Sequence, residues 1–177
     1  MSLLQHFLER EPNMTCMVSL DTSSTCTGYA CFHDGEYVES GTLSPDCTDN
    51  EERMNKMCVS IIEYLNANNP VIVVAELTVV ENNAHTQRLL SEILGVVRGW
   101  CIMHDAEFVT YRPNEWRSLV ALEDEVIPRK REECKLWAIE KAKEMLNRMY
   151  IDDNEAEGYL VGIARINDFI RNDWEEV

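Results

Sequence analysis

The chain is organised around Met17 to Phe32, MVSLDTSSTCTGYACF. Two short runs of β-favouring residues are separated by Ser, Thr and Gly, a pattern typical of a hairpin. The first run predicts a strand from Met17 to Asp21, and the second predicts a strand that follows Gly28. Because side chains alternate along a strand, Asp21 is expected near the strand's end, at the rim of a sheet. Taken alone, this carboxylate is better explained as a solvated turn residue.

The hairpin is expected to continue into a meander of three antiparallel strands. Asp34-Gly35 predicts a tight turn, and a third strand should span Tyr37 to Leu43. A helix should follow from Thr48 to Asn68, because its first residue and Glu51 match a capping box. Apolar residues at i, i+3 and i+4 spacing give this helix one buried face.

A second acid stands at the end of the next predicted strand. The run VIVVA at 71–75 is continuously apolar and is followed at once by Glu76. Such a run indicates a strand buried on both faces, so helices should cover both sides of the sheet. Ligands of open α/β sheets bind at the carboxyl ends of strands. Glu76 is therefore a candidate site residue beside Asp21, although it could simply reach solvent there.

The remaining elements are expected in the order helix, strand and three helices. After a loop at 78–83, they span Ala84–His104, Glu107–Tyr111, a short helix from Arg112, a helix from Pro128 to about Met149, and Asn154–Ile170. In the first of these helices Gly95 and Gly99 lower helix propensity unless another helix or a second copy of the chain packs closely there.

The charge distribution allows only a local nucleic-acid surface. The net charge is −16, which argues against a broad one. Nine of the sixteen Lys and Arg residues fall within 112–148. The turn Arg129-Lys130-Arg131 opposes the helix macrodipole, and the arrangement makes more sense if these side chains face phosphates. A merely solvated charge run explains them equally well.

Seven cysteines are odd in number and lack both a CxxC pair and a His-linked zinc spacing. Reduced thiols in a cytosol-like compartment are therefore expected. The N-terminus has no signal-peptide pattern, and the chain has no 18-residue apolar run. A soluble cytoplasmic protein without membrane contact is expected, with one domain at 14–172, an extension at 1–13 and a tail at 173–177.

A third group of acids opens the last predicted helix, DDNEAE at 152–157. Asp153 and Glu157 are four residues apart, so their carboxylates share one helical face and repel each other unless a cation lies between them. An acidic first turn favoured by the helix dipole explains any single one of them better. Together with Asp21 and Glu76, however, they form a set of oxygen ligands that suits Mg²⁺ or Mn²⁺.

The sequence resembles the RuvC-like Holliday-junction resolvases of the ribonuclease H-like superfamily, particularly the compact phage forms. The motifs that carry the resemblance are LDTSSTCTGYA at 20–30, VAE at 74–76, WR at 116–117, KREECK at 130–135 and DDNEAE at 152–157. The resemblance runs from about Val18 to Ala164. It implies an α/β ribonuclease H-like fold, with a five-stranded mixed sheet of three antiparallel and two parallel strands and helices on both faces.

The resemblance also implies an activity and the residues that perform it. Asp21, Glu76, Asp153 and Glu157 would bind two Mg²⁺ or Mn²⁺ ions, with Asp152 and Glu155 as substitutes. The reaction would be hydrolysis of a DNA phosphodiester to 5′-phosphate and 3′-hydroxyl ends. A homodimer, in contact at Gly95 and Gly99, would cut the two symmetric strands of a four-way junction, in host cytoplasm for a phage protein. The candidate phosphate contacts are Arg112, Arg117, Arg129, Lys130, Arg131 and Lys135.

Departures from the family pattern leave other functions open. The last acid of the family is usually Asp, whereas this chain has Glu157 followed by Gly158. A DNA-binding or assembly protein that lost its metal site is therefore one alternative, and an enzyme acting on RNA–DNA hybrids or flaps is another. An actin-like sugar or acetate kinase fits less well, because a Gly-rich phosphate loop and a second domain are absent. A nucleotide cofactor is not expected.

Overall fold

The sheet of the protein has the strand composition that the sequence predicts. The computed structural model describes residues 16–77 and 83–175. Its five strands are β1 (Met17–Asp21), β2 (Thr27–His33), β3 (Glu36–Leu43), β4 (Ile72–Glu76) and β5 (Glu107–Tyr111). They lie in the order β3-β2-β1-β4-β5, with β1–β2 and β2–β3 antiparallel and β1–β4 and β4–β5 parallel. The expected mixed sheet is confirmed.

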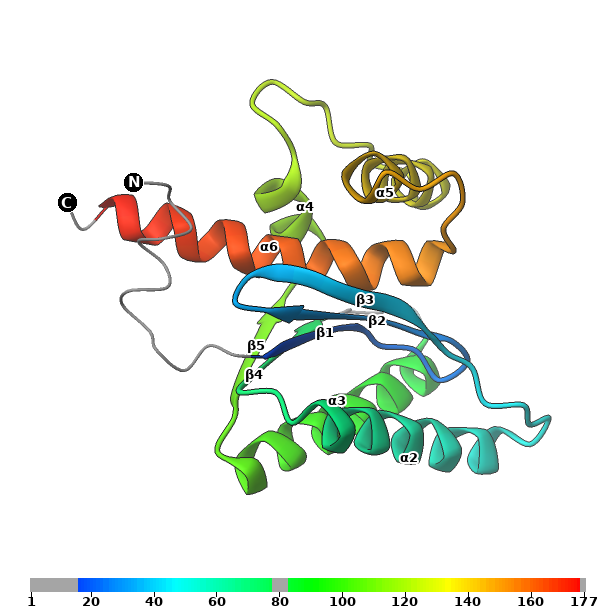
Figure 1. The fold of residues 1–177 in the computed structure, drawn as a ribbon. Coiled ribbons are helices and arrows are strands. Elements are labelled where there is room, and N and C mark those ends of the chain that lie inside the picture. Colours follow the sequence, from blue (N-terminus) through cyan, green and yellow to red (C-terminus); the bar gives the residue numbers. More distant parts are fainter. Residues whose placement is uncertain (1–15, 78–82, 176–177) are drawn as a thin grey trace.

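Helices cover both faces of this sheet (Figure 1). They are α2 (Asn50–Asn68), α3 (Ala84–His104), α4 (Pro113–Val120), α5 (Arg131–Leu146) and α6 (Asp153–Glu175). The α6 helix lies directly on one face, with α4 and α5 packed on its outer side, and α2 and α3 cover the other face. The apolar run of β4 is buried throughout, as a strand between two helical layers must be.

Helices α2 and α5 begin at residues other than those predicted. The N-cap of α2 is Asp49, whose carboxylate accepts a hydrogen bond from the Glu52 backbone N–H at 2.9 Å, so the capping box expected at Thr48 is wrong. The α5 helix begins at Arg131 because Lys130 has extended backbone angles. The Asp34-Gly35 turn is confirmed, with positive φ at both residues.

The last helix continues beyond its predicted end at Ile170. Polar side chains anchor this part of α6, since Asn167 Nδ2 and Arg171 Nη2 both donate to the Leu119 backbone carbonyl. The predicted extension at 1–13, most of the predicted loop at 78–83 and the last two residues of the predicted tail lie outside the described residues. No described helix combines the length and apolar character that crossing a membrane requires.

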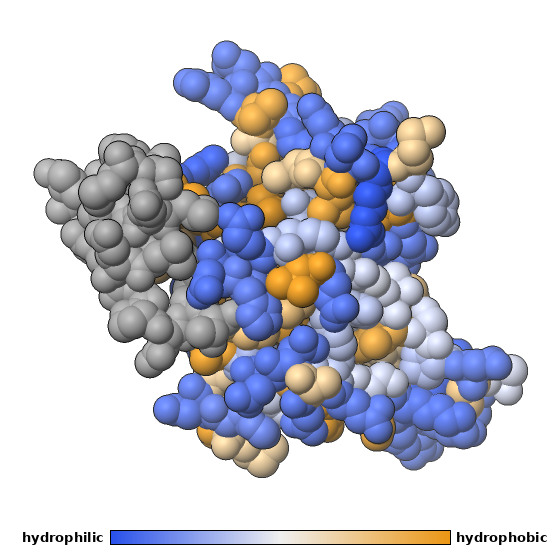
Figure 2. All heavy atoms as spheres, viewed as in Figure 1, coloured by the Kyte–Doolittle hydropathy of each residue, from blue (hydrophilic) through white to orange (hydrophobic). Residues whose placement is uncertain are grey.

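The surface agrees with the acidic composition. The face in Figure 2 is mostly hydrophilic, and its apolar residues form separate small patches. The apolar side chains instead form two clusters, one on each side of the sheet: one lies between the sheet and α4, α5 and α6, and the other between the sheet and α2 and α3.

Two glycines allow α6 to lie against the backbone of the β1–β2 hairpin. A Cβ atom added at Gly28 would lie 1.7 Å from the Asn154 carbonyl oxygen, and one added at Gly158 would lie 2.6 Å from the Gly28 carbonyl carbon. Ser19 Oγ donates to the Gly158 carbonyl at 2.7 Å across the same contact. The start of α6 therefore lies beside the end of β1, which is where both acidic segments are.

Replacing Gly28 by Ala should lower the free energy of unfolding by about 3 kcal/mol, because backbone on both sides must shift to admit the new methyl group. Chemical denaturation measures the change. Val59→Ala is the control: Val59 is 52% exposed on α2, so the gain in helix propensity should raise the free energy by less than about 1 kcal/mol. Equal effects of the two substitutions would contradict this account of the contact.

Candidate active site

Asp21 is the last residue of β1 and lies opposite Gly28 of β2. The Ser/Thr turn that follows is closed by two hydrogen bonds: the Ser23 backbone N–H donates to Thr27 Oγ1 at 3.0 Å, and Thr27 Oγ1 donates to the Ser23 carbonyl at 2.9 Å. This closed turn places Asp21, Thr22 and Ser23 together along the wall of a cleft. The prediction that Asp21 stands at the sheet's rim is therefore confirmed.

Glu76 ends β4, which runs parallel to β1, so both acids emerge at the same edge of the sheet. Its side chain is held rather than solvated. Trp116, fully buried in α4, donates its indole Nε1–H to Glu76 Oε2 at 2.6 Å, and Glu76 itself is 6% exposed. The hydrogen bond from Trp116 therefore fixes the orientation of the Glu76 carboxylate at the cleft.

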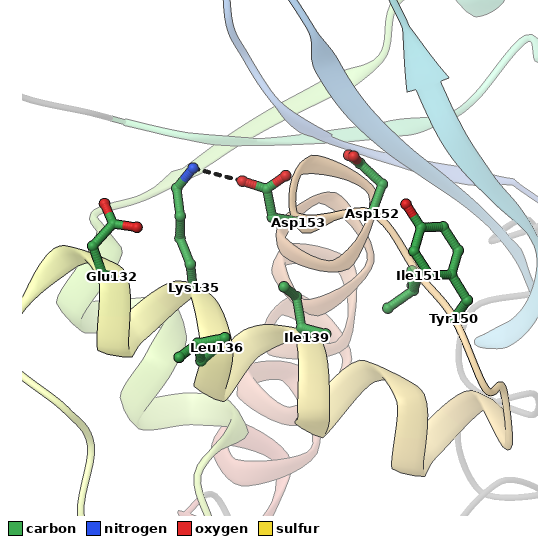
Figure 3. A pocket seen from close by; sticks show the side chains of 8 residues that line it. All are labelled: Glu132, Lys135, Leu136, Ile139, Tyr150, Ile151, Asp152 and Asp153. Carbon is green, nitrogen blue, oxygen red and sulfur yellow. Dashed lines mark hydrogen bonds and ion pairs between the residues drawn. The ribbon is translucent and has the colours of Figure 1, made fainter.

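The two acids of α6 are each paired with a cation. Arg117 Nη2 lies 3.2 Å from Glu157 Oε1, and Lys135 Nζ lies 2.5 Å from Asp153 Oδ2. Figure 3 shows Lys135 reaching from α5 to Asp153 at the start of α6. The sequence argument held that like charges at i and i+4 need a cation between them, and the structure supplies one cation for each acid.

The electrostatics of the cleft reflect crowded negative charge. Removal from water raises the pKa of Asp21 well above its ordinary value, and the charges of Glu76 and Glu157 raise it further. Burial and Glu76 likewise raise the pKa of Glu157, which Arg117 opposes. The hydrogen bond from Lys135 lowers the pKa of Asp153. Carboxylates that raise one another's pKa values in this way favour an added positive charge among them.

The cleft has a volume of about 640 Å³ and combines acids with bases. Asp21, Glu76 and Glu157 line it, whereas Asp153 lines the adjoining hollow drawn in Figure 3. Lys135 borders both spaces. The basic side chains that line the cleft are Arg117, Arg129, Arg131 and Lys135. Four of the six predicted phosphate contacts are thus gathered beside three of the four predicted metal ligands.

The other two predicted phosphate contacts do not line the cleft. Lys130 is exposed and pairs with Glu133 at 3.0 Å. Arg112 is the N-cap residue of α4, where its backbone N–H donates to Glu115 at 2.7 Å. Neighbours of these residues in the sequence line the cleft, but Lys130 and Arg112 do not.

The two substitute acids have structural partners. Asp152 precedes α6, and its Oδ1 accepts a hydrogen bond from the Asn154 backbone N–H at 2.9 Å. Glu155 Oε1 accepts from Ser40 Oγ at 2.6 Å and pairs with Arg148 Nη1 at 2.7 Å. Neither residue lines the cleft. Of the acids at 152–157, Glu157 lines it, and the charges of Glu157 and Asp153 both raise the pKa of Asp21.

The donor set of the cleft fits a hard divalent cation. Three carboxylates from three different elements line it, the charges of Glu76 and Glu157 raise the pKa of Asp21, and Arg117 and Lys135 stand in the cleft as compensating positive charge. Carboxylate oxygens are the ligands that Mg²⁺ and Mn²⁺ prefer. Asp21, Glu76 and Glu157 would hold such an ion, with Asp153 beside them.

The strand order β3-β2-β1-β4-β5 with helices on both faces is that of a ribonuclease H-like α/β fold. Solved structures assign the fold more narrowly. The Thermus thermophilus RuvC structure aligns with a TM-score of 0.69 at 12% identity, covering 89% of this chain and 96% of that one. T. thermophilus RuvC in complex with a Holliday junction substrate gives 0.67 at 13% identity, covering 86% and 93%.

A eukaryotic structure has the same fold. The yeast mitochondrial Holliday junction resolvase Ydc2 aligns with a TM-score of 0.56 at 12% identity, covering 96% of this chain and 88% of that one. No family model matches the chain, and no curated protein matches it in sequence. The chain therefore has the RuvC-like fold that its motifs indicated, at an identity too low to carry over the roles of individual residues.

Trp116 is the site residue whose role the sequence did not reveal. The Trp116-Arg117 pair was noticed as a motif, but its hydrogen bond reaches Glu76, forty residues earlier in the chain. The Arg117 guanidinium lies over the Trp116 ring, 4.6 Å from its centroid. One side chain thus orients both an acid and a base of the cleft, and only the fold brings these three residues together.

Trp116→Phe should weaken binding of Mn²⁺ by about 10–100-fold, the usual cost of removing a residue that orients a metal ligand. Calorimetric titration with Mn²⁺ measures this change. The matched control is Trp100→Phe, which removes an indole hydrogen bond of 2.8 Å to Asn66 on the other face of the sheet, and should leave Mn²⁺ affinity unchanged. Loss of affinity in both variants, or in neither, would contradict the role given to Trp116.

Proposed function

We propose that this protein is a metal-dependent endodeoxyribonuclease that resolves four-way or other branched DNA. The observation that carries the proposal is the cleft in which Asp21, Glu76 and Glu157 stand beside four basic side chains. The RuvC-like fold supports it, because one of the solved structures with this fold is a complex with a Holliday junction. A DNA-binding protein without activity is the alternative, and the ion pairs made by Asp153 and Glu157 are the observation that favours it.

The acids of the cleft would hold Mg²⁺ or Mn²⁺, with Asp21, Glu76 and Glu157 as ligands and Asp153 as a fourth. Two ions bound there would activate a water and neutralise the charge that develops on a phosphodiester. Glu76 keeps its orientation through Trp116. An ion there would take over the charge that Arg117 and Lys135 now give to Glu157 and Asp153, and each base would then be available to a phosphate.

Arg117 is well placed for that second role. Its Nε atom is buried and has no hydrogen-bond partner among the described residues. A buried donor without a partner is costly, so a phosphate oxygen that reached it would be bound favourably. Arg129 and Arg131 line the same cleft from the start of α5. These contacts set affinity and position rather than sequence choice.

The proposed enzyme is a homodimer, because a four-way junction has two symmetric strands to cut. The candidate contact is on α3. Atoms added at Gly95 and Gly99 would meet nothing within 4 Å, so a second copy has room to approach there. Ile102 and Met103 on the same helix are 75% and 77% exposed, and they extend the apolar surface available to a partner.

Cleavage of a synthetic four-way DNA junction in Mg²⁺ and in Mn²⁺ tests the proposal. The unmodified protein should make paired symmetric nicks, and Asp21→Asn and Glu157→Gln should each reduce the rate by at least about 10²–10³-fold, since each removes charge needed in the transition state. Glu155→Gln is the matched control on α6 and should cleave normally, because Glu155 lies outside the cleft.

Other outcomes would redirect or refute the proposal. Junction binding without cleavage under either metal would support the binding protein instead. Cleavage of RNA–DNA hybrids or flaps in preference to junctions would keep the metal site and change the substrate. Unpaired nicks on a symmetric junction would contradict the homodimer.

Arg131→Ala should weaken junction binding and reduce the slope of log affinity against log salt by about 0.9, since one phosphate contact is lost. Fluorescence anisotropy at several salt concentrations, in Ca²⁺ to prevent turnover, gives the slope. Lys130→Ala is the adjacent control and should change the slope little, because Lys130 is exposed and pairs with Glu133. The reverse order of the two effects would exclude the cleft as the DNA path.

A further inference from the structure

A second group of metal-binding side chains lies at the other end of the β1–β2 hairpin. Cys16, Cys31 and His33 each offer one ligand atom, and these atoms all lie within 4.8 Å of one another. The two thiols are 3.7 Å apart. This group and Asp21 lie at opposite ends of the hairpin, because β1 and β2 pair Met17 with Phe32 at one end and Asp21 with Gly28 at the other.

Strand pairing explains how residues so far apart in sequence meet. Cys16 and His33 stand one residue beyond the Met17–Phe32 pair. Cys31 and His33 are two residues apart on β2, so their side chains emerge on the same face of the sheet. Antiparallel register therefore brings the three side chains together although no short sequence motif connects them.

The distances fit a tetrahedral metal better than a disulfide. A zinc ion with Zn–S bonds of 2.3 Å and tetrahedral angles places its two sulfurs about 3.8 Å apart, and the observed separation is 3.7 Å. A disulfide requires about 2.05 Å between the sulfurs. The thiols, which share a hydrogen bond in the absence of an ion, are thus separated as two ligands of one zinc ion would be.

The group is buried at its two cysteines and exposed at its histidine. Cys16 and Cys31 are 3% and 1% exposed, whereas His33 is exposed at the end of the strand. Apolar residues of the core, Val18 and Leu65 among them, pack with the two cysteines. Among the described residues, Asn68 Oδ1 accepts a hydrogen bond from Cys31 Sγ at 3.7 Å, and solvent reaches the group at His33. The Asn68 oxygen or a water molecule would complete a set of two thiolates and one imidazole.

We propose that Cys16, Cys31 and His33 bind one Zn²⁺ ion in a site separate from the acid-lined cleft. Thiolate and imidazole ligands select zinc over Mg²⁺, whereas the carboxylates of the cleft have the opposite preference. Zinc binding replaces the protons of the two thiols, which leave to solvent. The ion links the start of β1 to the end of β2 and stabilises the hairpin from which Asp21 projects.

Cobalt substitution tests this site directly. The full-length protein is reduced, stripped of metal with a chelator and titrated with Co²⁺. One equivalent should produce a thiolate-to-cobalt charge-transfer band and the strong visible absorption of four-coordinate cobalt, and one equivalent of Zn²⁺ should abolish both. Cys16→Ser and Cys31→Ser should each lower zinc affinity at least 100-fold and reduce the charge-transfer band.

Further variants separate the proposed site from misfolding and from the cleft. His33→Gln changes an exposed side chain, so its fold should be intact by circular dichroism while zinc affinity falls at least tenfold. Cys58→Ser, a half-buried thiol on α2, and the double variant Asp21→Asn/Glu157→Gln should both bind cobalt with the unchanged spectrum. These results together would support the site.

Three results would overturn the proposal. The first is a titration without any charge-transfer band. The second is zinc affinity that is the same in the His33→Gln variant and the unmodified protein. The third is a Cys16–Cys31 disulfide in the isolated protein, identified by mass spectrometry, with no zinc uptake after its reduction.

Discussion

The structure depends on the contact between the backbone of α6 and the backbone of the β1–β2 hairpin. Gly28 and Gly158 leave no space for a Cβ atom between the two elements, and Ser19 donates to the Gly158 carbonyl across the contact. Because the helix lies so close, a carboxylate of its first turns stands beside the acid that ends β1. Side chains of ordinary size at these positions would hold the helix away and separate the acids.

Gathering the acids has an electrostatic cost that the fold offsets with bases. The carboxylates raise one another's pKa values, and Arg117 and Lys135 compensate by pairing with Glu157 and Asp153. In a chain of net charge −16 basic residues are scarce, and these two are among those that could bind a phosphate at the cleft. Under the proposed function these bases would have to exchange carboxylate partners for phosphates, so a bound metal would promote DNA contact as well as chemistry.

The sequence predicted the fold well because its signals are local. Runs of β-favouring residues, the continuous apolar run before Glu76 and the turn at Asp34-Gly35 specify the sheet. The start of α2 was misplaced because Asp49, and not Thr48, caps the helix. The four acids of the site could be predicted because each lies at the end of a strand or in the first two turns of a helix. Trp116 was missed as a partner of Glu76, and the Cys16–Cys31–His33 group was missed because register rather than spacing brings them together.

The most direct test of the acid cluster is to locate a bound ion. Crystals grown in Mn²⁺ and measured at the manganese absorption edge would reveal it by anomalous scattering. The account predicts an anomalous peak coordinated by Asp21, Glu76 and Glu157, with Arg117 moved away from Glu157. A cleft without a peak at saturating Mn²⁺, with Arg117 still on Glu157, would contradict it and identify the acids as partners of bases alone.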